Sequence, residues 1–268
     1  MLHTGSVKYP QVKLTGPEGD GTLLTQRPFF RPGTKRPMSL ARLLRKIPLF
    51  VGFGPSEFES LEKCLVRRRY PGGQALFHMG DEGSSLHIIE SGRVKVTIPS
   101  SSGEELILAI FGAGDLLGEL SLFDGKPRSA TVQALEDTET LCLHREDLLA
   151  LMRNRFDVVE KILEVLARRV RDTGMLLAES HFLDITSRLA KKILDLGDTF
   201  GVREGGQVRI GVKITQKDLA SMIGATRESI NKQLKTLRDQ DLIRIIGGTI
   251  EILNRERLAQ KARMFPKP

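Results

Sequence analysis

Residues 214–237 read ITQKDLASMIGATRESINKQLKTL, and their pattern decides how the C-terminal part of the chain folds. Thr215 and Asp218 have the spacing of an N-terminal capping box, so a helix is expected to begin there. Gly224 permits the positive φ of a tight turn, and Thr226 is a good cap for a second helix. The stretch therefore predicts two short helices separated by a tight turn.

The second predicted helix divides apolar from polar side chains. Ile230, Leu234 and Leu237 form its apolar stripe. Arg227 and Glu228 fall in the first turn, where the recognition helix of a helix-turn-helix meets base edges in the major groove of DNA. An Arg there can bind guanine through two hydrogen bonds, and a Glu can accept one from cytosine. The candidate DNA-binding residues are Thr215, Lys217, Thr226, Arg227, Glu228, Lys232 and Lys235, among which Thr215, Lys217 and Lys235 are the candidates for phosphate contacts.

The charge distribution fits DNA binding, and a predicted β-hairpin favours DNA binding over a helical hairpin whose polar face is merely solvated. The net charge is +8; residues 184–268 hold 17 Lys and Arg against 10 acidic residues, whereas residues 41–183 hold 18 against 21. A near-neutral middle joined to a basic C-terminal segment fits one part that binds something small and another that binds a polyanion. Two apolar runs around Gly247 and Gly248 add a predicted β-hairpin, which would form a wing beside the two helices.

Residues 50–145 predict an all-β domain. Short runs of alternating apolar and polar residues are separated by turn signals rich in Gly, Pro, Asp and Ser. Many short strands at even spacing indicate a jelly-roll or barrel-like domain. Short helical stretches near 40–47 and 55–64 precede its strands. The expected strands comprise residues 75–77, 86–89, 94–98, 105–110, 130–132 and 139–143.

Residues 147–183 read as one long helix, with no Pro and a single Gly. A seam that steps alternately by three and four residues needs a partner helix, so we expect a homodimer through residues 156–180. Ile162 and Val165 widen the stripe, which leaves open a long helix lying against its own domain. The seam consists of Phe156, Val159, Leu163, Leu166, Val170, Thr173, Leu177 and Ser180.

The remaining features complete the domain organisation. Cys64 and Cys142 are isolated in apolar surroundings, so we expect core packing and no disulfide framework or metal site. No apolar run approaches the roughly 18 residues that a membrane span requires, so we expect no membrane partner and a cytoplasmic protein. The expected fold class is α+β, with a disordered basic arm (1–39), a β-roll (40–146), a long dimerisation helix (147–183) and a winged helix-turn-helix domain (184–268).

Residues 118–131 read GELSLFDGKPRSAT and resemble the phosphate-binding cassette of cyclic-nucleotide-binding domains. A cyclic phosphate needs a guanidinium and backbone donors, which Arg128 and a short helix beginning near Leu120 can supply. The resemblance implies that Arg128 and Ser129 bind the phosphate and that Glu119 accepts from the ribose 2′-hydroxyl. The alternative is a surface turn with a Glu–Arg salt bridge. The candidate ligand residues in this segment are Gly118, Glu119, Leu120, Arg128, Ser129 and Ala130.

Residues 214–248 closely resemble the helix-turn-helix of the cyclic AMP receptor protein and FNR family, and with the cassette the resemblance covers residues 40–253. In that family the residues at the positions of Arg227 and Glu228 read a TGTGA-type half-site. The resemblance therefore implies double-stranded DNA with a palindrome similar to TGTGA-N6-TCACA as one partner and RNA polymerase as another. Lys232 stands where many members carry a second base-reading Arg, which leaves open a related half-site.

The resemblance also implies an effector, with cyclic AMP as the first choice. Members of the family contact the base through a Thr followed by a small hydroxyl residue on the long helix, and this chain has Thr173 and then Gly174. The missing hydroxyl leaves cyclic GMP, another ligand or an empty pocket open. No cofactor or metal is expected, because the N-terminal cysteines of the iron–sulfur branch and grouped haem ligands are lacking.

Three functions remain open. In the first, ligand at Glu119 and Arg128 reaches the long helices through Thr173, and the DNA domains rotate about a hinge at 182–184. The second is an effector-independent regulator of the same fold, which Gly174 favours. The third is a regulatory subunit of a cyclic-nucleotide-dependent enzyme, which the helix-turn-helix disfavours. The chain itself is not expected to be an enzyme, because no nucleophile–base pair, metal cluster or Gly-rich phosphate loop of an enzymatic kind is present.

Overall fold

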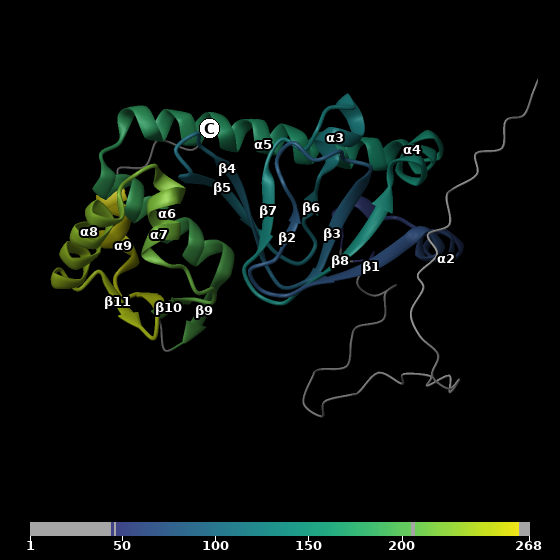
Figure 1. The fold of residues 1–268 in the computed structure, drawn as a ribbon. Helices are drawn as coiled ribbons and strands as arrows, with labels where there is room; N and C mark the ends of the chain where they lie inside the picture. The colour runs from purple at the N-terminus through teal and green to yellow at the C-terminus, as the bar shows by residue number, and fades with distance from the viewer. Residues whose placement is uncertain (1–43, 46, 205–206, 263–268) are drawn as a thin grey trace, which may run out of the picture. The chain divides into compact units, whose positions relative to one another are not determined.

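The computed structural model describes residues 44–45, 47–204 and 207–262 (Figure 1). The predicted arm at 1–39 and the first part of the helix predicted at 40–47 lie outside these residues. Within them the α+β prediction is confirmed: a β-rich domain is followed by a long helix and a C-terminal helix-turn-helix. Leu44 and Ile47, from the end of the first predicted helix, are both buried.

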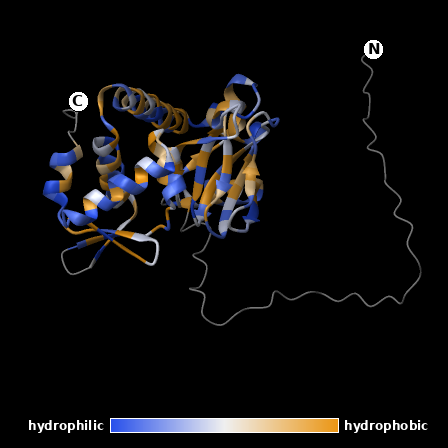
Figure 2. Ribbon diagram, turned by 60° about the vertical axis from the view of Figure 1, so that its left-hand side comes forward, coloured by the Kyte–Doolittle hydropathy of each residue, from blue (hydrophilic) through white to orange (hydrophobic). Residues whose placement is uncertain are grey.

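The β-roll consists of two four-stranded antiparallel sheets. Apolar and polar residues are interspersed along the strands (Figure 2). Every second residue is buried at 131–134, whereas residues 86–89 and 140–143 are each four consecutive buried residues. A 3-10 helix η1 (Pro48–Phe50) and α2 (Pro55–Cys64) precede the sheets, and α2 has the predicted bounds. All six expected strands are present. The first sheet has the order β1 (Leu65–Tyr70), β8 (Thr138–His144), β3 (Ser85–Ser91) and β6 (Leu116–Leu117); the second has β2 (Ala75–Phe77), β7 (Thr131–Ala134), β4 (Val94–Pro99) and β5 (Glu105–Phe111).

Strand β1 was not predicted, because three consecutive arginines interrupt its apolar pattern. The strand lies at the edge of its sheet and pairs only with β8 among the described strands. Arg67 forms a two-pronged contact with Glu90, at 2.6 and 2.7 Å, and Arg69 lies 2.6 Å from Glu139. Charged side chains on an edge strand also discourage pairing with other chains, so the arginines suit the position.

Two helices occupy the segment in which one was predicted, so the prediction of a continuous helix over 147–183 is wrong. Helix α4 (Arg145–Asn154) ends before Arg155, and α5 (Phe156–Phe182) begins after it. Arg155 is extended, with φ −137° and ψ 96°. Its guanidinium contacts both Glu57 and Asp157, and its Nη2 lies 2.6 Å from Asp157 Oδ2. One of these ion pairs is local and the other, with Glu57, joins residues far apart in the chain. Both stabilise the break, and helical periodicity could not reveal the pair with Glu57.

In the C-terminal domain the sequence predicts a helix that is capped by Asp184 and runs to about Leu196, followed by a loop from Gly197. The cap is present, because the carboxylate of Asp184 accepts from the backbone N–H of Ser187 at 2.8 Å at the start of α6 (Ile185–Phe200). The loop prediction is wrong, because α6 continues through Gly197. A Cβ at Gly197 would lie 2.7 Å from Ile252 Cδ1, so this glycine serves close packing. The domain continues with β9 (Gly201–Glu204), β10 (Gln207–Ile210), α7 (Gln216–Ile223), α8 (Arg227–Asp239), β11 (Ile243–Ile246), β12 (Thr249–Ile252) and α9 (Arg255–Ala262), and its sheet has the order β11-β12-β10-β9.

Candidate functional site

The predicted cassette forms a tight cradle between β6 and β7. Gly118 has φ 80° and connects β6 to the short helix α3 (Glu119–Asp124). A Cβ on Gly118 would lie 2.2 Å from Nη1 of Arg128, and one on Gly83 would lie 2.4 Å from the Cβ of Ser121. Both positions therefore require glycine. Residues 80–83 read GDEG, which is typical of a turn, but this local signal does not place Gly83 in the cradle.

Arg128 is buried in the cradle, with 5% of its surface exposed. Its Nη1 donates to the carbonyl of Gly118 at 2.7 Å, and its Nη2 donates to that of Ser85 at 2.8 Å. The Phe77 ring centroid lies 4.3 Å from its Cζ. Burial lowers the pKa of this guanidinium. Its Nε is buried and has no partner among the described residues, so the Nε–H donor lacks an acceptor that an anion could supply.

Glu119 lies in the same cradle and is 4% exposed. One carboxylate oxygen accepts a hydrogen bond from Arg169 of α5, and the other is buried without a partner among the described residues. Arg169 also donates to the carbonyl of Leu116 and lies over the ring of Phe111. Arg169 was not among the predicted site residues. It stands one helical turn before Thr173, and this spacing was the signal that could have identified it.

The other predicted ligand residues are distributed differently. Ser129 is exposed and Ala130 is buried, while Leu120 is 45% exposed on α3. Thr173 is exposed on α5, and its hydroxyl donates to the carbonyl of Arg169 at 2.8 Å. A Cβ at Gly174 would have open space around it. The contacts in the described part of the chain thus bring Gly118, Glu119 and Arg128 together, and Arg169 connects Thr173 to Glu119.

A buried polar cluster lies on β3 and β8 near the cradle. His87 is 5% exposed, and its Nδ1 lies 3.3 Å from the Sγ of Cys142. Burial, followed by the nearby charges of Arg128 and Arg68, lowers the pKa of His87 to about 4. Burial also raises the pKa of the Cys142 thiol. Both groups are therefore neutral at pH 7, and Cys142 packs in the core as predicted.

The helix-turn-helix has the predicted local structure. Thr215 and Asp218 form the capping box of α7, with each backbone N–H 3.0 Å from the other side chain. Gly224 has φ 61° and ends α7, and Thr226 accepts from the backbone N–H of Ser229 at 3.2 Å to cap α8. The stripe of Ile230, Leu234 and Leu237 is buried.

Helix α6 fixes the two helices of this motif. Arg188 donates from Nη1 to the carbonyl of Ile223, the last residue of α7, at 2.6 Å, and Thr186 donates to Oε1 of Gln233 on α8 at 2.8 Å. The predicted wing is present as the hairpin of β11 and β12. The candidate DNA-binding residues Thr215, Lys217, Thr226, Arg227, Glu228, Lys232 and Lys235 are all exposed.

Comparisons with known proteins agree with this architecture. The family described as "Cyclic nucleotide-binding domain" matches residues 67–155, and that described as "Crp-like helix-turn-helix domain" matches residues 187–261. The CRP-like cAMP-activated global transcriptional regulator of Mycobacterium tuberculosis is 37% identical over 221 residues, which cover 82% of this chain and 99% of that protein. The Cyclic AMP receptor protein of Thermus thermophilus is 36% identical over 206 residues, covering 76% and 92%.

Among solved structures, the c-di-GMP responsive global regulator CLP of Xanthomonas campestris has a TM-score of 0.62 and 26% identity, and covers 73% of this chain and 97% of its own. Fold and site thus define a DNA-binding transcription regulator with a cyclic-nucleotide-binding domain. The chain belongs to the Crp/Fnr family, which is a family of regulators and not of enzymes. None of the helices in the described part of the chain is long and apolar enough to cross a membrane.

Proposed function

We propose that this regulator is a homodimer whose affinity for DNA is controlled by a cyclic nucleotide, with cyclic AMP as the first choice. The observation that carries the proposal is the pair of unpartnered polar atoms in the cradle, Nε of Arg128 and one oxygen of Glu119. Buried polar groups without partners are costly, by about 1–3 kcal/mol each. A cyclic phosphate would satisfy the donor, and a ribose hydroxyl would satisfy the acceptor.

The identity of the nucleotide rests on the relatives and on the base side of the site. The relatives from Mycobacterium tuberculosis and Thermus thermophilus are named for cyclic AMP, whereas the Xanthomonas campestris protein is described as responsive to c-di-GMP. Thr173 can offer a hydroxyl to the base, but Gly174 offers none. Cyclic AMP is therefore the first ligand to test, with cyclic GMP and cyclic di-GMP as competitors.

Calorimetric titration of the purified protein with each nucleotide tests this assignment. Arg128→Leu should abolish binding of all of them, because the phosphate loses its guanidinium. Glu119→Gln should weaken binding of nucleotides with a free ribose 2′-hydroxyl. Lys126→Leu is the matched control, since it removes an exposed positive charge from the same segment. Wild-type protein that binds no nucleotide would instead support the effector-independent regulator.

The proposed dimer uses the exposed seam of α5. Phe156, Leu163, Val170 and Leu177 are spaced by seven residues and are 56–73% exposed, which is unusual for large apolar side chains on one face. A second copy of α5 would cover them. Sedimentation should give a dimer for the wild type and a monomer for Val170→Glu. Asp172→Lys, an exposed change outside the seam, should leave the dimer intact; a monomeric wild type would contradict the proposal.

A two-fold dimer would present Arg227 and Glu228 to successive major grooves, about one turn of the duplex apart. We therefore propose a palindrome similar to TGTGA-N6-TCACA as the binding site, with Lys232 allowing variation in the half-site, and RNA polymerase as the partner in transcription. A regulator of this kind would act where the chromosome is, in the cytoplasm. Cyclic AMP should tighten binding to the palindrome by roughly 5–150-fold, the usual range of allosteric coupling. An unchanged affinity at saturating nucleotide would contradict the coupling.

The contacts of Arg169 support a route for this coupling. Arg169 lies on α5 and already binds Glu119 in the cradle. A nucleotide that binds Glu119 would therefore change the contacts of α5 directly. The packing of the paired α5 helices would then alter the hinge at 182–184 and the orientation of the DNA-binding domains.

A further inference from the structure

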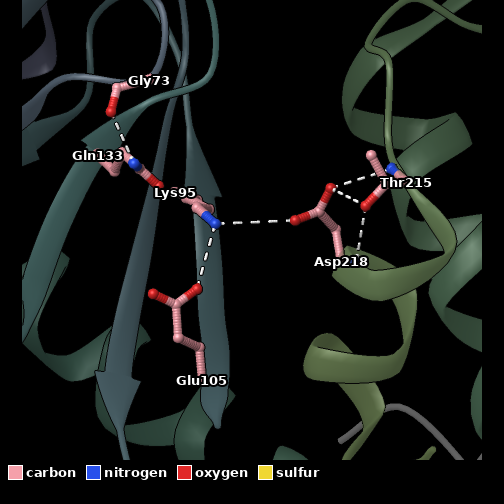
Figure 3. A network of polar contacts seen from close by, with 6 residues as sticks. All are labelled: Gly73, Lys95, Glu105, Gln133, Thr215 and Asp218. Atoms are coloured by element: carbon pink, nitrogen blue, oxygen red, sulfur yellow. Dashed lines mark hydrogen bonds and ion pairs between the residues drawn. The ribbon is translucent and has the colours of Figure 1, made fainter. Parts of the chain in front are cut away.

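One lysine of the β-roll contacts the helix-turn-helix. Lys95 on β4 places its Nζ 3.3 Å from Oε2 of Glu105 on β5 and 3.8 Å from Oδ1 of Asp218 on α7 (Figure 3). The side chains of Lys95 and Asp218 are only 14% and 17% exposed. An ion pair shielded in this way is less weakened by solvent than a surface pair.

The carboxylate of Asp218 has a second set of partners. Its Oδ2 accepts from the backbone N–H of Thr215 at 3.0 Å and from the hydroxyl of Thr215 at 2.6 Å (Figure 3). One carboxylate therefore joins a β-roll lysine to the N-cap of α7. Thr215 is itself a candidate phosphate contact, so the ion pair reaches the edge of the DNA-binding surface.

Apolar packing surrounds this polar contact. Ile107 of β5 is 2% exposed and belongs to the same buried cluster as Ile214 and Met222 of the DNA-binding domain. The partly buried Ile110 and Leu135 add to it from the β-roll. An apolar centre with an ion pair beside it is the composition of a specific interface and not of a chance surface contact.

The contact leaves the DNA-binding surface open. All seven candidate DNA-binding residues are exposed while α7 packs on β5. A phosphate that approaches Thr215 and Lys217 also approaches the negative charge of Asp218. The positive charge of Lys95 offsets this repulsion, because the interaction between charges a few ångströms apart is strong in a shielded site.

We propose that Lys95 is a positioning residue for DNA binding: it holds α7 against the β-roll in the orientation that binds DNA and neutralises Asp218 beside the phosphate contacts. The inference rests on the proposed function in that the palindrome is the ligand of α8, but it does not depend on which nucleotide is the effector. It assigns a part of the DNA affinity to a residue of the nucleotide-binding domain.

A double-mutant cycle on DNA affinity tests the proposal. The variants are Lys95→Met, Asp218→Asn, which retains an acceptor for the cap, and the combination of the two. Lys95→Met should weaken DNA binding at least threefold when Asp218 is present. In the Asp218→Asn background, the factor by which Lys95→Met weakens DNA binding should be less than half as large. Lys95→Arg should retain affinity, and Lys63→Met, which removes an exposed lysine from α2, should change nothing. Additive effects in the cycle would overturn the proposal.

A second measurement reports the contact without DNA or nucleotide. The chain contains no Trp, so Phe200→Trp introduces a single tryptophan, which can be excited selectively, at the end of α6, where the Phe200 ring lies 5.5 Å from the guanidinium of Arg93 on the β-roll. Adding Lys95→Glu should shift its emission to longer wavelength, because repulsion of Asp218 and Glu105 opens the contact to water. An unshifted emission, with circular dichroism showing a folded protein, would overturn the proposal. The emission of this Trp depends on neither DNA nor nucleotide. A wild type that binds neither the palindrome nor any nucleotide would therefore count against the proposed function and not against the contact of Lys95 with Asp218.

Discussion

Lys191 on α6 and Glu179 on α5 form an ion pair across the bend between these helices, with Nζ 2.9 Å from Oε1. Glu179 is only 6% exposed, and Lys191 also lies 3.0 Å from Asp195 Oδ2. The bend at 183–184 joins the long helix to the DNA-binding domain. A buried pair at this place restricts the angle of the bend, because any rotation that separates the two charges leaves a carboxylate in the protein interior.

Lys191→Met should lower the free energy of unfolding by roughly 1–3 kcal/mol, because the carboxylate of Glu179 then loses a partner while it remains buried. The combined variant Glu179→Met and Lys191→Met should recover most of this loss, since no charge is left stranded. Urea denaturation measures both. Lys161→Met is the control. Lys161 and Glu164 form an exposed ion pair between residues one helical turn apart, which contributes about 0.5 kcal/mol or less to the free energy of unfolding. Equal effects of Lys191→Met and Lys161→Met would contradict the role of the pair.

Local signals in the sequence predicted local structure well. The capping box of Thr215 and Asp218, the turn at Gly224 and the cap at Asp184 depend on residues a few positions apart, and the structure contains all of them. Alternation likewise predicted six strands of the β-roll. The α+β fold could therefore be predicted from the sequence without knowledge of any long-range contact.

Features that depend on residues far apart in the chain could not be predicted from the sequence. The break at Arg155 depends on Glu57, which lies 98 positions away in the chain. The cradle around Arg128 depends on Gly83, which the sequence marked only as a turn. Arg169 is an ordinary basic residue of a helix until the fold places it against Glu119. The cassette residues could be predicted because they are contiguous, whereas their partners could not.

Gly174 provides a test of the base side of the nucleotide site. It lies within α5, where Gly costs about 0.5–1 kcal/mol relative to Ala, and a Cβ there meets nothing within 4 Å. Gly174→Ala and Gly174→Ser should therefore both stabilise the protein in thermal unfolding. Only Gly174→Ser adds a hydroxyl beside Thr173, so only that variant should raise the affinity for cyclic AMP relative to cyclic GMP in calorimetry. Equal selectivity of the two variants would place the base elsewhere.

His87 should make stability depend on pH. Its pKa is about 4 in the folded protein and about 6.5 when unfolded, so between these values the unfolded chain binds a proton that the folded chain excludes. The free energy of unfolding should be highest above pH 6.5 and should fall by up to about 3 kcal/mol as the pH drops to 4. Urea denaturation at a series of pH values measures this.

His87→Gln should remove that part of the slope, since Gln does not titrate. His144→Gln is the matched control, because it removes an exposed histidine from the same sheet. A slope that survives His87→Gln would assign the acid sensitivity to the carboxylates.

Arg227 and Lys217 should contribute to DNA binding in different ways. Arg227 lies in the first turn of α8 and Lys217 near the start of α7, and both are exposed. Arg227→Ala should weaken binding to the palindrome by about 1–3 kcal/mol and reduce discrimination against a changed guanine, because the bidentate contact to that base is lost. Lys217→Ala should weaken binding to all sequences alike and reduce the dependence of log affinity on log salt by about one unit per site, because one phosphate contact is lost. Fluorescence anisotropy at several salt concentrations, with matched and altered duplexes, separates the two effects, and an Arg227→Ala variant that keeps full discrimination would remove this residue from base recognition.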